Sequence, residues 1–232
     1  MKTFLIVGGV SGIGLEVVKL LNKDNLVIVL SRNKRNLDQL SNIEFHTLDV
    51  TKSIDDFPIL DYKLDGLVYC PGTINLKPFK NFKIEDFQYD LEVNFLGAVK
   101  VINKYLNNLM HAEKSSIVLF STVAVQTGMQ YHASIASAKG AIEGLTRSLA
   151  AEFAPNIRVN CIAPSITLTP LAEKFLNSDS KIKASEERHP LKRIGNAKEI
   201  AELVTFLLSE SASFITGQII KVDGGLSTLK TI

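Results

Sequence analysis

A glycine-rich stretch close to the amino terminus reads Phe4-Leu5-Ile6-Val7-Gly8-Gly9-Val10-Ser11-Gly12-Ile13-Gly14. Its four leading apolar residues are typical of a buried strand, and residues 13–21 follow with the spacing of an amphipathic helix. Glycine tolerates a positive φ, and it lets a phosphate group approach the backbone at the positively polarised start of a helix. The stretch therefore predicts a strand, a phosphate-binding turn and a helix, with a purely structural tight turn as the alternative.

Short apolar runs and longer helical patterns alternate along the rest of the chain. We expect strands at residues 4–7, 26–30, 67–70, 117–120, 157–162 and 219–222. We expect helices at residues 13–21, 93–110, 136–153 and 197–208. This alternation predicts an α/β fold of the Rossmann type, a doubly wound parallel sheet with helices on both faces. Because no Pro-rich or Gly-rich linker divides the 232 residues, we expect a single domain over residues 1–232.

The composition is that of an ordinary globular protein, with 46% hydrophobic residues and a net charge of +2. Basic residues are scattered and balanced by acidic ones, so we expect no nucleic-acid partner. No apolar run approaches about 18 residues, so we expect no membrane span. Cys70 and Cys161 lie far apart in apolar surroundings, which indicates reduced thiols and a cytoplasmic protein. The four histidines lack metal-ligand spacing, so no metal site is expected.

One polar stretch rich in Lys and Glu lies near the carboxyl end, at residues 177–188. We interpret it as a mobile lid over a small-molecule substrate, with a plain surface loop as the alternative. The substrate pocket would then be formed largely by residues 167–188.

The spacing GxxxGxG of Gly8, Gly12 and Gly14 resembles the short-chain dehydrogenase/reductase family. Later segments resemble the same family, in the same order along nearly the whole chain: Leu48-Asp49-Val50, Val93-Asn94, Val159-Asn160, Pro164 with Thr169, residues 191–195, Glu199-Ile200-Ala201 and Val222-Asp223-Gly224-Gly225. The resemblance implies a nicotinamide dinucleotide cofactor. It also implies a homo-oligomer, a dimer or tetramer, assembled through the helices that carry Asn94 and Lys139. The cofactor-binding residues that it implies are Gly8, Ser11, Gly12, Ile13, Gly14, Ser31, Arg32, Asp49, Val50, Gly72, Lys139, Pro164 and Thr169.

The end of the second strand, Ser31-Arg32, bears on which dinucleotide is bound. In this fold an acidic side chain there accepts hydrogen bonds from the ribose of NAD, whereas a basic one pairs with the extra phosphate of NADP. Arg32 presents a planar fork of donors suited to phosphate, and Lys34 and Arg35 add charge. We therefore expect NADP(H) to be preferred over NAD(H). The alternative is that Arg32 only caps a solvated loop.

The catalytic pattern of the family has one member missing here. The family uses a Tyr as general acid, a Lys one helical turn later, a Ser or Thr, and an Asn. Lys139, Thr122 and Asn94 match three of these positions. The resemblance implies that Lys139 binds the nicotinamide ribose and acts on the acid by its charge. The tyrosine position is Ile135, and an alkyl side chain can neither give nor take a proton.

Three interpretations of this departure are open. In the first, Tyr131 replaces the missing acid, as a displaced Tyr does in related enoyl reductases, provided that the segment before Ser134 is non-helical and folds back. In the second, hydride transfer proceeds with a weaker hydrogen-bond donor: Ser121, Thr122, Ser134 or a water held by Lys139. In the third, the protein binds a dinucleotide without redox chemistry, as a sensor, a partner subunit or an enzyme of another class. Departures at Val7, residues 69–71 and Ser165 keep this third interpretation open.

Together these patterns predict an NADP(H)-dependent oxidoreductase that reduces a carbonyl or enoyl substrate, with acyl thioesters among the candidates. The predicted catalytic residues are Asn94, Thr122, Tyr131 and Lys139. The alternative is a non-redox dinucleotide-binding protein that has lost the catalytic Tyr.

Overall fold

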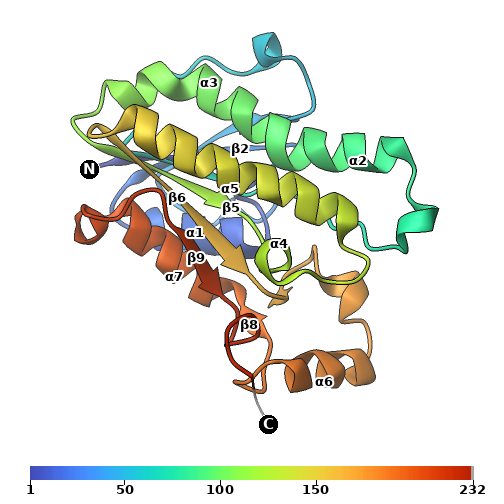
Figure 1. The fold of residues 1–232 in the computed structure, drawn as a ribbon. Coiled ribbons are helices and arrows are strands. Elements are labelled where there is room, and N and C mark those ends of the chain that lie inside the picture. The colour runs from blue at the N-terminus through green and yellow to red at the C-terminus, as the bar shows by residue number, and fades with distance from the viewer. Residues whose placement is uncertain (231–232) are drawn as a thin grey trace.

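The computed structural model describes residues 1–230, so the last two residues of the domain expected over 1–232 lie outside the described residues. Seven parallel strands form the central sheet, in the order β3-β2-β1-β4-β5-β6-β9 (Figure 1). Their bounds are Thr3–Val7 (β1), Leu26–Ser31 (β2), Ile43–Thr47 (β3), Gly66–Tyr69 (β4), Ser115–Phe120 (β5), Ile157–Pro164 (β6) and Ile219–Val222 (β9). The strand order reverses at β1, whose neighbours are β2 and β4. In a doubly wound sheet, ligands bind beyond the carboxyl ends of the strands at such a switch point.

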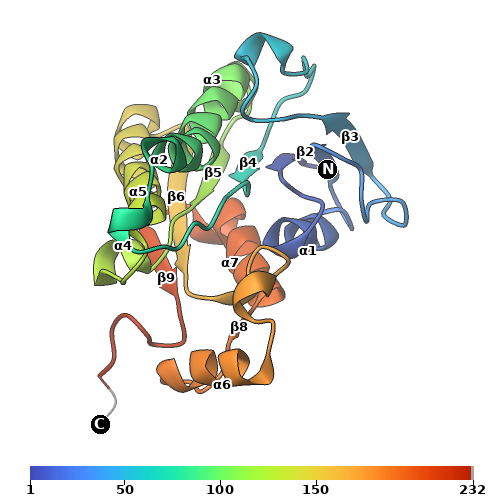
Figure 2. The same cartoon turned by 90° about the vertical axis from the view of Figure 1, so that its right-hand side faces the viewer.

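Helices cover both faces of the sheet (Figures 1 and 2). On one face lie α1 (Gly12–Leu21) and α7 (Ala197–Leu208), which pack against each other. On the other face lie α2 (Ile84–Leu91), α3 (Gly97–Met110) and α5 (Ala133–Phe153). Because the sheet is apolar on both sides, the molecule has two hydrophobic cores, one under each layer of helices.

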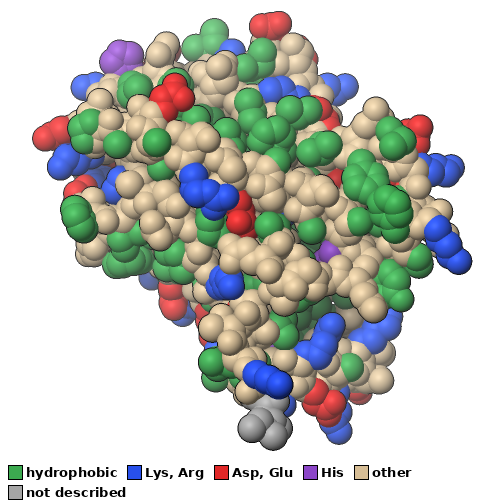
Figure 3. Space-filling view, viewed as in Figure 1, with side chains coloured by type: hydrophobic (Ala, Val, Ile, Leu, Met, Phe, Trp, Pro, Cys, Tyr) green, Lys and Arg blue, Asp and Glu red, His purple; other side chains and the backbone are tan. Residues whose placement is uncertain are grey.

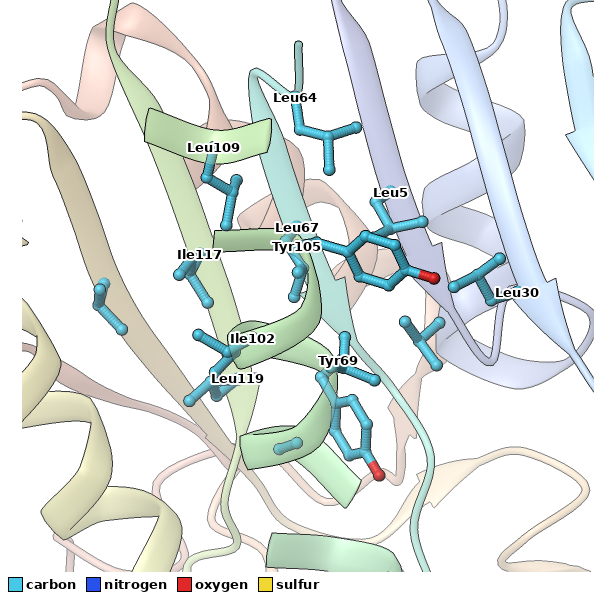
Figure 4. Close-up of a cluster of buried hydrophobic side chains, with 14 of the residues drawn as sticks. Leu5, Leu30, Leu64, Leu67, Tyr69, Ile102, Tyr105, Leu109, Ile117 and Leu119 are labelled. Atoms are coloured by element: carbon cyan, nitrogen blue, oxygen red, sulfur yellow. The ribbon is translucent and has the colours of Figure 1, made fainter. Parts of the chain in front are cut away.

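The core under α3 reaches the carboxyl edge of the sheet (Figure 4). Leu5 of β1 and Ile117 of β5 are fully buried, and Tyr105 of α3 packs in the same cluster. At the end of β4, the Tyr69 hydroxyl donates a hydrogen bond to the Val93 carbonyl at 2.6 Å. This buried bond fixes the helical segment before α3 against the end of β4.

The parallel sheet and its two helical layers confirm the predicted Rossmann-type fold. The strand β3 was not predicted, because its sequence alternates apolar and polar residues at the edge of the sheet instead of forming a continuous apolar run. The helix predicted at residues 93–110 belongs to a longer column, in which a π-helical turn, Glu92–Leu96, joins α2 to α3.

The carboxyl-terminal part adds smaller elements beyond the sheet edge. A two-stranded sheet pairs β7 (Thr167–Leu168) with β8 (Gly195–Asn196). Between them lies α6 (Asp179–Arg188), so most of the stretch at residues 177–188 is helical and not a loop. The other short elements are α4 (Ala124–Thr127) and single 3-10 turns at Ile54–Asp56, Phe79–Asn81, Glu173–Phe175 and Glu210–Ala212.

Charged side chains of both signs are interspersed over the face of the molecule that Figure 3 shows. Several opposite charges pair directly, as Lys100 does with Glu92 at 2.7 Å. Within residues 1–230, none of the helices combines the length and the hydrophobicity that crossing a bilayer requires.

Candidate active site

The turn after β1 follows a backbone path that side chains would block. Gly8 and Gly12 have φ angles of +80° and +52°, in the left-handed region that favours glycine. A Cβ atom on Gly14 would overlap the carbonyl oxygen of Gly8. Ser11 precedes α1 in an extended conformation, and its side chain makes no capping bond. The first N–H groups of α1 are therefore available to an anion, and the turn fits the pyrophosphate of a dinucleotide.

The loop after β2 lies beside this turn. Asn36, which has a φ of +62°, donates a hydrogen bond from Nδ2 to the Val10 carbonyl at 3.0 Å. Arg32 is exposed to solvent in the same loop. A hydrogen bond from the backbone N–H of Thr51 lowers the pKa of the Asp49 carboxyl group, and the positive charge of Arg32 acts in the same direction. Ser31 of β2 pairs with Thr47 of β3, so Arg32 and Asp49 follow neighbouring strand ends.

Asn94 and Lys139 approach the same glycine, Gly72, in the loop after β4. A Cβ atom there would lie 3.2 Å from Asn94 Oδ1 and 3.7 Å from Lys139 Nζ. Asn94 is fully buried in the π-helical turn, and its side-chain amide donates to the Asp90 carbonyl at 2.8 Å. The structure thus brings together two of the predicted catalytic residues and one predicted cofactor residue.

The ammonium group of Lys139 is held in a largely apolar setting. The residue is 8% exposed, and burial lowers its pKa to about 8. The thiols of Cys70 and Cys161 lie near it, and burial raises the pKa of each thiol to about 12. The carboxylate of Asp90 opposes the effect of burial on the pKa of Lys139. The site therefore holds a cation at neutral pH that loses its proton at mildly alkaline pH.

Ile135 occupies the position where the family has its tyrosine, and two hydroxyl residues follow β5. Ile135 lies one turn before Lys139 on α5 and is 4% exposed. Thr122, just beyond β5, accepts a hydrogen bond on Oγ1 from the backbone N–H two residues later at 3.3 Å. The Ser121 hydroxyl, by contrast, donates to the buried carboxylate of Glu143 at 2.8 Å. Thr122 is therefore better placed than Ser121 to donate to a substrate oxygen.

Tyr131 lies in the loop that leads into α5. Its φ is +69°, which is uncommon for a residue other than glycine, and it is 54% exposed. Its carbonyl accepts a hydrogen bond from the Lys77 N–H at 3.3 Å. The helix begins at Ala133, so the segment before Ser134 is non-helical. The structure does not bring the Tyr131 hydroxyl into a hydrogen bond with the other predicted catalytic residues.

A segment beyond β7 crosses the mouth of the site. A Cβ atom on Gly12 would lie 3.2 Å from Thr169, so these two residues are in close contact. Lys174 Nζ donates a hydrogen bond to the Ile74 carbonyl at 2.7 Å. A hollow of about 510 Å³ is lined by Pro170, Leu171, Glu173, Lys174 and Asn177. The other predicted cofactor residues stand at the same edge of the sheet: Ile13 in the first turn of α1, Ser31 at the end of β2, Val50 after β3 and Pro164 at the end of β6.

Ser165, one of the departures from the family pattern, has a buried partner. Its hydroxyl contacts Nε2 of His189 at 2.9 Å, and His189 is 2% exposed. The Nδ1–H of the same ring donates to the Ser185 carbonyl at 2.7 Å. The two bonds tie the end of β6 to α6.

A buried carboxylate next to Asn94 was missed by sequence reasoning. Asp90 has no exposed surface. It accepts hydrogen bonds from Thr73 Oγ1, from Asn75 Nδ2 at 2.9 Å and from Ser134 Oγ at 2.6 Å. Its one signal in the sequence was its place four residues before Asn94, on the same side of a helix.

Comparisons with known proteins identify the family of the chain. The model of a family described as enoyl-(acyl carrier protein) reductase matches residues 8–227. A tropinone reductase homolog of Arabidopsis thaliana is 35% identical over 241 residues, which cover 96% of this chain and 92% of that protein. The chain therefore belongs to the short-chain dehydrogenase/reductase family, whose members that match it here are oxidoreductases.

Solved structures support the same assignment. A short-chain dehydrogenase family protein from Francisella tularensis superposes with a TM-score of 0.90 at 32% identity, covering 99% of this chain and 100% of that one. ElxO with NADP bound superposes with a TM-score of 0.85 at 29% identity, covering 97% of this chain and 98% of that one.

Proposed function

We propose that the protein is an NADP(H)-dependent reductase of a carbonyl or enoyl substrate, with acyl thioesters among the candidates. The observation that carries the proposal is the approach of Asn94 and Lys139 to Gly72, at the carboxyl edge of the sheet and beside the glycine turn. A buried cation and a fixed amide at this edge fit a site that orients a nicotinamide and its substrate. The hollow bordered by Lys174 would hold part of the substrate.

Arg32 supports the preference for NADP(H). Its guanidinium is exposed and lies near Asp49, and the loop that carries it is joined to the glycine turn through Asn36. A free guanidinium in that place suits the additional phosphate of NADP. ElxO, a relative by structure, has NADP bound.

Tyr131 remains the proposed acid, with Thr122 as a second hydrogen-bond donor. The non-helical backbone at Tyr131 supports this role, which also requires the segment to fold back toward Lys139. When bound, the reduced nicotinamide supplies a hydride to carbon, and a proton must reach oxygen or the neighbouring carbon. Tyr131 would deliver that proton after the exposed loop turns its hydroxyl inward, while Lys139 stabilises the negative charge that develops.

The proposal extends to the compartment, the assembly and a mobile segment of the protein. We propose a cytoplasmic homo-oligomer, a dimer or tetramer, assembled through the helical column of Asn94 and through α5. The segment at residues 177–188 is proposed to move as a substrate lid on α6.

Oxidation of NADPH with acetoacetyl and crotonyl thioesters tests this function. We expect turnover by the unaltered protein and a loss of roughly 100-fold or more in both Tyr131→Phe and Lys139→Ala, because each removes a group needed for proton transfer. Ile135→Tyr restores the family pattern and should raise carbonyl reduction. Unchanged turnover in Tyr131→Phe would remove that residue from the mechanism.

The second candidate function is that of a non-redox dinucleotide-binding protein. The observation that favours it is the buried alkyl side chain of Ile135 at the tyrosine position. Tight binding of NADPH without turnover on a broad panel of carbonyl and enoyl substrates would support this candidate over the reductase.

A further inference from the structure

The buried carboxylate of Asp90 is linked to Asn94 through one hydroxyl. Asn94 Nδ2 can only donate, and it reaches both Thr73 Oγ1 at 2.7 Å and the Asp90 carbonyl at 2.8 Å. The Thr73 hydroxyl therefore directs its own proton to Asp90 Oδ1. Asn94 Oδ1 is left to accept from the Thr73 N–H at 3.3 Å and to face Gly72. The Asn94 amide is thus locked in one orientation.

The same carboxylate holds the helix that carries Lys139. Ser134, in the first turn of α5, donates to Asp90 Oδ2 at 2.6 Å and is 1% exposed. It directly precedes Ile135 and follows the loop of Tyr131. The bond between Asp90 and Ser134 therefore fixes the first turn of α5, on which the position of every proposed catalytic group of that helix depends.

Burial of a carboxylate is costly unless its oxygens are hydrogen-bonded. Three donors from two segments meet this requirement at Asp90: the loop after β4 supplies Thr73 and Asn75, and α5 supplies Ser134. A well-packed apolar side chain would join α2 to α5 without that cost. A purely structural role therefore does not explain why a charge is kept at this point.

Asp90 also supplies negative charge near Lys139. The titratable groups that face Lys139 are Cys70 at the end of β4, Cys161 of β6 and Asp90 of α2. Both thiols have pKa values raised to about 12 by burial, so they are uncharged at neutral pH. Glu143, one turn further along α5, is engaged by Ser121. Asp90 is therefore the carboxylate whose charge favours the protonated form of Lys139.

We propose that Asp90 is a positioning residue of the active site. It locks the Asn94 amide through Thr73 and, through Ser134, anchors the first turn of the helix that carries Lys139. The effect of Asp90 on turnover rests on the proposed function, whereas its effect on Lys139 does not.

The effect on Lys139 is tested without any substrate. The protein is labelled with 13Cε-lysine, and the Lys139 signal is assigned with Lys139→Arg and followed through a pH titration. In Asp90→Asn we expect the midpoint to fall, because a negative charge is removed at constant shape. Asp65→Asn is the matched control, since Asp65 bonds to the Thr3 N–H near the start of β4, at the opposite edge of the sheet. Equal midpoints in the two variants would overturn this part of the proposal.

The effect on Asn94 is tested by a double-mutant cycle on NADPH oxidation. We expect Thr73→Val and Asp90→Asn each to lower kcat roughly tenfold with little change in KM, and the double variant to be no worse than Asp90→Asn alone. Strictly additive losses would show that Asp90 does not act through Thr73. If the unaltered protein turns over no substrate, the proposed function fails, and the lysine titration still decides the role of Asp90.

Discussion

The glycine turn and the first turns of α5 differ in how closely they follow the pattern of the family. In the glycine turn, the positions where a side chain would strain or block the backbone, Gly8, Gly12 and Gly14, all remain glycine. In α5, Lys139 is kept but the tyrosine position is the buried Ile135. The half of the site that contains the glycine turn is therefore constrained by backbone shape, while the half at α5 differs from the family in a side chain.

The largest effect is expected from breaking the turn. In Gly14→Ala the new Cβ would overlap the Gly8 carbonyl, which is backbone and cannot turn aside as a flexible side chain would. We expect the free energy of unfolding to fall by about 1–3 kcal/mol and dinucleotide binding to become undetectable. Chemical denaturation and fluorescence titration with NADPH measure the two effects.

Gly144→Ala is the matched control for this substitution. Gly144 lies within α5, and an added Cβ would meet nothing within 4 Å. Because alanine favours the helix, stability should rise by roughly 0.5–1 kcal/mol with binding unchanged. Normal NADPH binding by Gly14→Ala would show that the turn tolerates a side chain, and the comparison between the two halves would then fail.

The second prediction concerns the ammonium group of Lys139 on α5. Since the pKa of Lys139 is about 8, kcat/KM for reduction should fall about tenfold per pH unit above pH 8, and Lys139→Met should lack this limb. Burial lowers the pKa of Lys139 from its ordinary value of 10.5. Between about pH 8 and pH 10.5 the unfolded chain therefore keeps the Lys139 proton that the folded protein has lost, and the free energy of unfolding rises with pH. A rate profile that stays flat to about pH 9 would contradict the assignment.

The smallest effect is expected at the adenosine end. Arg32→Ala should reduce the preference for NADPH over NADH by roughly tenfold, because one exposed charge-assisted contact is lost. Lys34→Ala is the control, since Lys34 already pairs with Asp38 at 3.4 Å and should change the preference less. Titration of both reduced cofactors against each variant measures the ratio. If the unaltered protein bound NADH more tightly than NADPH, the proposed preference for NADP(H) would be wrong.

The difference between the glycine turn and α5 also explains which features could be predicted from the sequence. Local sequence patterns predict the buried strands and the glycine turn, because a buried strand or a turn with positive φ requires particular residue types at consecutive positions. The Asp90 network has no such signature, since Thr73 and Ser134 lie 17 and 44 residues from Asp90 in the chain. The edge strand β3 and the π-helical turn escaped prediction for a related reason, because tertiary packing decides them more than local propensity does.

The π-helical turn at Glu92–Leu96 has a consequence for how this site could be lost or changed in evolution. Its backbone bond runs from the Gly97 N–H to the Glu92 carbonyl, five residues back, so the column carries one residue more than an α-helical turn needs. One residue corresponds to about 100° of rotation along a helix. A single deletion there would rotate α2, and Asp90 with it, by about this angle relative to α3. The orientation of α2 relative to α3 thus depends on the number of residues in this turn. A point substitution does not change that number, whereas the deletion of one codon does.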